Sequence, residues 1–173
     1  MFEGWSDFFL MVGSAAAVLI GLIFVVISLM QGRSRSSVLA GSRIYMGPIV
    51  LGVSFLLVLA AAALTPGITP TAFAIITGAV AIWGLTRGMI SIFGIRALGT
   101  SEDAPHWTDV WYYGLMPCAV YFGLMIAAIA VWREDWWDKY WLAVIVTGGL
   151  LLAIRNEWDL ITWIAPRGDS TDH

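Results

Sequence analysis

Residues 8–30 read FFLMVGSAAAVLIGLIFVVISLM, a continuous apolar run that contains no charged side chain. A helix rises about 1.5 Å per residue and the hydrocarbon core of a bilayer is about 30 Å thick, so roughly 20 apolar residues cross it. An open strand is excluded there, because unpaired backbone groups in lipid cost several kcal/mol each. Residues 8–30 therefore predict a transmembrane helix.

Three further segments have the same character. Residues 44–64 and 110–132 carry no charge, and residues 72–93 are interrupted only by Arg87. With a fifth segment near the C-terminus, they predict an all-α fold: one integral membrane helical bundle over residues 1–173. Its five transmembrane helices are expected at about 8–30, 44–64, 72–93, 110–132 and 136–164.

The fifth segment has two interpretations. Its clean apolar stretch, residues 140–154, is about 22 Å long as a helix and is short for a span. In the first interpretation the helix continues through Arg-Asn-Glu-Trp-Asp to residue 164, which brings three charges close to the membrane. In the second, the span ends at Arg155 and the rest lies at the interface as an amphipathic helix. A four-span protein, with this whole segment on the surface, is the less favoured alternative.

Composition excludes several classes of protein. The chain is 60% hydrophobic and 12% charged, against about half and a quarter in soluble domains. A net charge of −3 leaves no basic surface for nucleic acid, and one cysteine cannot make a disulfide framework. The two histidines, His106 and His173, lie outside the spans, so we expect no haem, no other cofactor and no metal site. No nucleophile is paired with a base, and we expect no enzymatic activity.

The basic residues indicate an orientation. Seven of the nine Lys and Arg residues fall on one side of a five-span chain, and only Arg133 and Lys139 fall on the other. Because cytoplasmic loops carry the excess of Lys and Arg, this division predicts an external N-terminus and a cytoplasmic C-terminus.

Small residues mark two expected packing faces. Gly13, Ala17 and Gly21 recur every four residues in the first span, and Gly84 and Gly88 do so in the third. Small side chains at this spacing let helix backbones approach closely in lipid. The sequence does not say whether the neighbouring helix belongs to the same chain or to another copy.

Charged residues in or near the spans are the candidate binding or pathway residues: Arg87, Arg155, Asn156, Glu157 and Asp159. Arg87 lies about 9 Å from the end of its span, so its long stem can also reach the headgroups without any functional role. Arg155 and Asp159 are i,i+4 neighbours and can pair locally. If the last helix reaches residue 164, Asp159 and Arg87 lie at similar depths, and we expect an ion pair between them, with Arg155 and Asn156 close by.

The first span, with AAAVLIGLIFVVISL at residues 15–29, and the late segment AIRNEWDLITW at residues 153–163 resemble a group of small, uncharacterised bacterial multi-pass membrane proteins. That group has an Ala-rich first helix and an Arg-Asn-x-Trp-Asp-Leu segment near the end. The resemblance implies a bacterial inner-membrane location. It also implies that Arg155, Asn156, Trp158 and Asp159 belong to the group's pattern, whereas Glu157 departs from it. The resemblance carries no activity.

Two functions remain open at this point. The first is a homo-oligomeric channel or transporter for an ion or small solute, because a chain of this size cannot easily enclose a conduit alone. The second is a non-enzymatic accessory or regulatory subunit of a larger membrane complex. The expected partners are the lipid bilayer and copies of the chain itself, or else another membrane protein, and not nucleic acid. Oligomeric state distinguishes the two functions.

Overall fold

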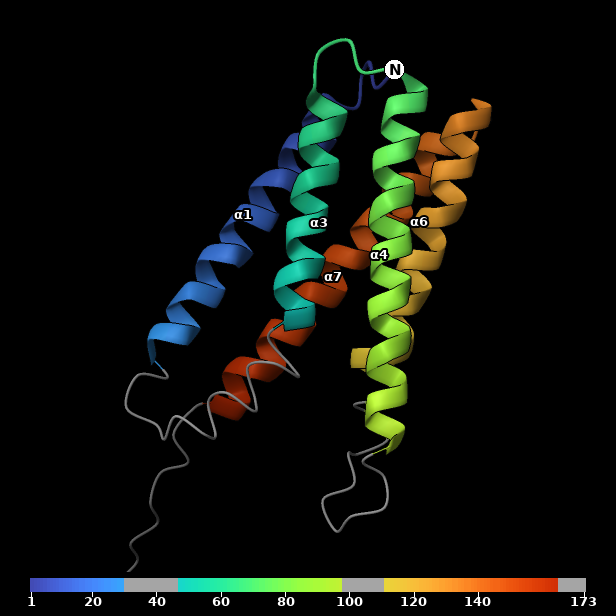
Figure 1. Cartoon of the computed structure of the whole chain (residues 1–173). Coiled ribbons are helices and arrows are strands. Elements are labelled where there is room, and N and C mark those ends of the chain that lie inside the picture. The colour runs from blue at the N-terminus through green and yellow to red at the C-terminus, as the bar shows by residue number, and fades with distance from the viewer. Residues whose placement is uncertain (30–46, 98–110, 165–173) are drawn as a thin grey trace, which may run out of the picture.

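The computed structural model describes residues 1–29, 47–97 and 111–164. Within these ranges every regular element is helical (Figure 1). The elements are α1 (Ser6–Leu29), α3 (Gly47–Leu64), α4 (Pro70–Ala97), the π-helical turn η2 (Trp111–Leu115), α6 (Met116–Arg133) and α7 (Asp138–Ile164). The all-α prediction is confirmed, with one long helix for each of the five segments. The predicted span ends at residues 30, 44 and 110 lie outside the described ranges.

Three of these helices are long and apolar enough to cross a membrane. The suitable segments are Ser6–Val25 in α1, Pro70–Ile90 in α4 and Met116–Arg133 in α6, while Ile49–Leu64 in α3 is a shorter apolar helix. Only 28% to 39% of each long segment is buried inside the chain, so large apolar side chains such as Phe24 and Phe122 point outward. An outer surface of this kind is unfavourable in water and fits contact with acyl chains.

Short turns hold successive helices antiparallel. Thr69 caps α4, because its Oγ1 accepts a hydrogen bond of 3.2 Å from the backbone N–H of Ala72, and Pro70 follows at a position where no N–H is needed. Gly67, in the same turn, has a φ of 73°. The α6 helix ends at Glu134, which adopts a left-handed conformation with a φ of 55°. Each turn is only a few residues long, so α3 lies antiparallel to α4, and α6 to α7.

Helix pairing divides the bundle into two halves that α7 joins. The closest pairs are α1 with α3 and α4 with α6, and α7 runs obliquely between these pairs (Figure 1). Gly149 marks the crossing: a Cβ there would lie 3.3 Å from Val120 of α6 and 3.4 Å from Leu56 of α3. The inward face of α7 repeats at helical spacing, with Leu142, Val146, Ala153 and Leu160 all buried.

Aromatic side chains pack together at one end of the bundle. This is the end where the N-terminus lies, marked N in Figure 1. The ring of Phe2 packs edge-on against Phe9 of α1 and Phe73 of α4, with centroids 4.8 Å and 4.7 Å away. The indole N–H of Trp141 donates a 3.0 Å hydrogen bond to the Gly123 carbonyl, which ties α7 to α6. The same end also carries polar groups, because Asp138 is buried at the start of α7 and Arg133 lies 3.8 Å from Asp135.

The last described segment forms one long helix. The α7 helix begins at Asp138 and continues through the Arg-Asn-Glu-Trp-Asp run to Ile164, which is about 40 Å of helix. The helix therefore continues to residue 164, as the first interpretation of this segment requires. Its position relative to a membrane stays a prediction. All four polar candidates between residues 155 and 159 lie on α7.

Candidate functional site

The candidate site lies in the last third of α7, where polar residues replace the apolar inward face. Asn156 and Glu157 are 6% and 3% exposed, and they lie between the buried Ala153 and Leu160 in the helical repeat. Arg155 and Asp159 lie on the flank of the same helix, and both side chains are 39% exposed. Two buried polar side chains thus interrupt the apolar inward face of α7 at this point.

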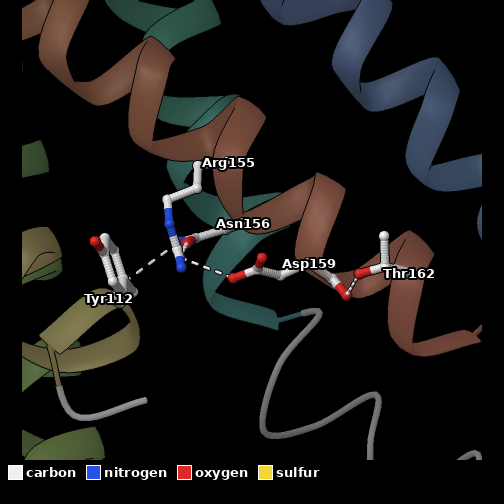
Figure 2. A network of polar contacts seen from close by, with 5 residues as sticks. All are labelled: Tyr112, Arg155, Asn156, Asp159 and Thr162. Carbon is white, nitrogen blue, oxygen red and sulfur yellow. Dashed lines mark hydrogen bonds and ion pairs between the residues drawn. The ribbon is translucent and has the colours of Figure 1, made fainter. Parts of the chain in front are cut away.

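Arg155 is the centre of a polar network (Figure 2). Its Nη1 lies 2.8 Å from Oδ2 of Asp159, one turn further along α7, and 3.5 Å from Oδ1 of Asn156. Its guanidinium carbon lies 3.2 Å from the centroid of the Tyr112 ring. A planar guanidinium can stack on an aromatic face and pair with a carboxylate at once, which a lysine ammonium does poorly. Arg155 is therefore already occupied by three partners.

Asn156 connects α7 to the start of the fourth predicted span. Its Nδ2 donates a 3.4 Å hydrogen bond to the backbone carbonyl of Tyr112 in η2. A π-helical turn leaves some carbonyls without their usual helical partner, and such turns are frequent at functional positions. Further along α7, the Thr162 hydroxyl donates a 2.9 Å hydrogen bond to the Asp159 carbonyl (Figure 2). The network thus joins α7 to η2 through Asn156 and Tyr112, which are 44 residues apart in the sequence.

Glu157 has no such partner. Both carboxyl oxygens are buried, and neither has a hydrogen-bond partner within the part of the chain that the structure describes. Buried polar groups are nearly always hydrogen-bonded, and an unpaired buried carboxylate is more costly than an unpaired neutral group. Glu157 is consequently the side chain whose position needs an explanation beyond packing.

The expected ion pair between Arg87 and Asp159 does not form. Arg87 is exposed on α4, and the described partner of Asp159 is Arg155. The reason is geometric: residues four apart on one helix meet whenever the helix forms, whereas a contact between α4 and α7 requires the two helices to approach. Arg155 and Asn156 do lie beside Asp159, but Arg87 is not brought into the site.

The predicted packing residues separate into two groups. Three of them lie at contacts within the chain: Gly13 faces Ala60 of α3, Gly84 faces the Tyr121 ring, and Gly88 faces the Cys118 sulfur. Ala17 and Gly21, in contrast, are exposed, and a Cβ at Gly21 would meet nothing within 4 Å. Within one chain, therefore, only Gly13 of the predicted α1 face lies against another helix, and Ala16 is buried in place of Ala17. Packing of Ala17 and Gly21 against another copy stays a prediction.

Tyr112 and Tyr121 were not identified from the sequence. Tyr112 carries the cation–π contact and the carbonyl that receives Asn156, while Tyr121 fills the notch that Gly84 leaves in α4. Neither residue stands out in an aromatic-rich chain. The small residue Gly84 was the available signal for Tyr121, because a missing side chain implies a large neighbour.

An apolar groove lies away from these polar residues. It has a volume of about 370 Å³, lies between the start of α4 and the end of α6, and is lined by Thr71, Ala74, Ile75, Ala128, Ile129 and Trp132. Its lining is almost wholly apolar and suits a hydrocarbon chain better than a polar solute. The described residues also contain no group of three His, Cys, Asp or Glu side chains that could hold a metal ion.

Comparisons of the chain with protein-family models, with curated proteins and with solved structures gave no match.

Proposed function

We propose that the protein is a multi-pass membrane protein of the bacterial inner membrane that moves an ion or small solute as a homo-oligomer. The observation that carries the proposal is the buried pair Asn156 and Glu157 on the inward face of α7. Ionisable residues are expensive inside a membrane protein, and those that are present typically mark pathways or binding sites. The neighbouring groups supply no nucleophile with a base, which argues against catalysis.

The exposed small residues of α1 support assembly from several copies. Ser14, Ala17 and Gly21 lie at i, i+3 and i+7 on the outer surface of the single chain. Small side chains make few van der Waals contacts with lipid, so exposure of this surface to acyl chains stabilises it little. The same small side chains allow the backbone of another helix to approach closely. A second copy is the occupant we propose, and a conduit between copies removes the need for a pore inside one small bundle.

In this proposal all five helices cross the membrane, with the N-terminus outside and the C-terminus in the cytoplasm. The alternation of the five helices along the bundle and the seven-to-two division of Lys and Arg support this orientation (Figure 1). The polar network at the end of α7 then lies on the cytoplasmic side.

Flux into lipid vesicles tests the proposed activity. The full-length chain is reconstituted, a gradient of H⁺, Na⁺ or K⁺ is imposed, and the internal ion concentration is followed with a fluorescent indicator. We expect at least one of these ions to equilibrate faster than in protein-free vesicles, and Glu157→Leu to slow it because the polar side chain is lost. Glu134→Gln, in the exposed turn after α6, is the matched control and should behave as the unaltered chain does.

Equal rates with and without protein for all three ions would contradict transport of small cations. If the chain instead purified in fixed stoichiometry with a different membrane polypeptide, the accessory role would be favoured.

A further inference from the structure

Glu157 is singled out by what surrounds it. In the described part of the chain, the elements that pack most closely against α7 are α1, α3, α6 and η2. The only charged residue of α1 is Asp7, at the opposite end of the bundle, and α3 has none. The α6 helix contributes Cys118, Tyr121 and the distant Arg133, and η2 contributes Tyr112. None of these elements brings a cation to the Glu157 end of α7.

Charges on α7 itself do not neutralise Glu157 either. Asp159 has the same sign, and the Arg155 guanidinium is held by Asp159, Asn156 and the Tyr112 ring. Moving Arg155 to Glu157 would leave Asp159 without its partner, so among the described residues one of the two carboxylates would remain without a cation. An uncompensated carboxylate that is 3% exposed is strongly unfavourable, and such a group neutralises itself by binding a cation.

The groups around Glu157 determine which cation it can bind. A hard metal ion requires several oxygen ligands, about six for Mg²⁺ or Ca²⁺. The nearest polar side chain in the sequence is Asn156, and both ends of its amide are already bonded. Its oxygen accepts a hydrogen bond from Arg155, and its N–H donates one to the Tyr112 carbonyl. The described residues supply no cluster of three His, Cys, Asp or Glu side chains. A proton needs only one carboxyl oxygen.

From this geometry we infer that Glu157 is a reversible proton-binding site inside the bundle. One carboxylate oxygen takes up a proton from water at the adjacent end of the bundle, an O–H bond forms, and the neutral acid is the buried form. Release of the proton regenerates the carboxylate, which the present packing does not accommodate. The use of this site to couple proton movement to transport rests on the proposed function, but proton binding itself does not.

Infrared spectroscopy of the full chain in lipid vesicles tests the inference without any transport assay. At neutral pH we expect the carbonyl band of a protonated carboxylic acid, shifted in D₂O. The band should be lost in Glu157→Gln and kept in Glu134→Gln. It should also disappear on alkalinisation and return on acidification. Identical spectra for the unaltered chain and Glu157→Gln in this region would overturn the inference.

Thermal stability gives a second, independent readout. Glutamine has nearly the shape of a protonated glutamate and is neutral, so Glu157→Gln should melt within a few degrees of the unaltered chain. A large loss of stability in this variant would show that the carboxylate form is required, and would overturn the proton site. A carboxylic-acid band without ion flux would contradict the transport proposal alone, whereas flux without the band would contradict the proton site alone.

Discussion

Replacing Gly84 with alanine is expected to destabilise the bundle by about 1 to 3 kcal/mol, the usual cost of overpacking a well-filled contact. A methyl group on Gly84 would overlap the Tyr121 ring, including the carbon that joins the ring to the side chain. The ring cannot easily turn away, because it packs edge-on against Phe55 with centroids 6.1 Å apart and its hydroxyl approaches Gly52. The α4–α6 contact must therefore open.

The matched control is Gly148→Ala on α7, where an added Cβ would meet nothing within 4 Å. Alanine favours a helix over glycine by up to about 1 kcal/mol, so this change should be neutral or stabilising. Unfolding in detergent, followed by circular dichroism, compares the two variants. If Gly84→Ala proved as stable as Gly148→Ala, the close α4–α6 packing would be wrong. Removal of the ring in Tyr121→Ala should abolish most of the Gly84→Ala penalty, since the two residues are in contact.

Arg155→Leu is the second change with a large expected effect, a loss on the order of 1 to 2 kcal/mol. The half-exposed ion pair with Asp159 accounts for the smaller part of this loss, because solvent screens it. The cation–π contact with Tyr112 supplies the rest, and Asn156 loses a neighbour as well. Arg155→Lys should restore only part of the stability, since an ammonium cannot stack flat on the ring.

Two comparisons separate this network from surface charge effects. Arg133→Leu is the control, because its 3.8 Å contact with Asp135 lies at a side chain that is 69% exposed, and we expect a change within about 0.5 kcal/mol. Arg155→Leu and Asp159→Leu should be less than additive when combined, whereas Arg87→Leu and Asp159→Leu should add. Additivity of the first pair, or coupling of the second, would contradict the observed pairing.

The helices were predictable because each contains a long uncharged run, and length and hydropathy are local properties of the sequence. The i,i+4 relation of Arg155 and Asp159 was likewise readable, since it depends only on the helix. The sequence does not indicate which helices contact one another. The pairing of Arg87 with Asp159 failed because similar depth does not place two side chains on facing surfaces.

The same limit applies to the small residues of α1. Gly13 and Ala17 look equivalent at i and i+4, yet the rotation of α1 buries the side of the helix that carries Ala16 against α3 and turns Ala17 outward. Rotation is set by tertiary packing, which no pattern in α1 alone determines. Glu157 was recognised as a candidate, but its burial without a described partner depends on neighbours from other helices.

Native mass spectrometry of the chain, released from its membrane in mild detergent, tests most directly whether identical copies assemble through the exposed face of α1. The unaltered chain is predicted to appear as a closed homo-oligomer of a single stoichiometry. Gly21→Leu is predicted to shift it to monomers, because the bulky side chain would hold the helices apart, whereas its Cβ would meet nothing within 4 Å in its own chain. A monomer for the unaltered chain, or an oligomer that Gly21→Leu leaves intact, would contradict the account.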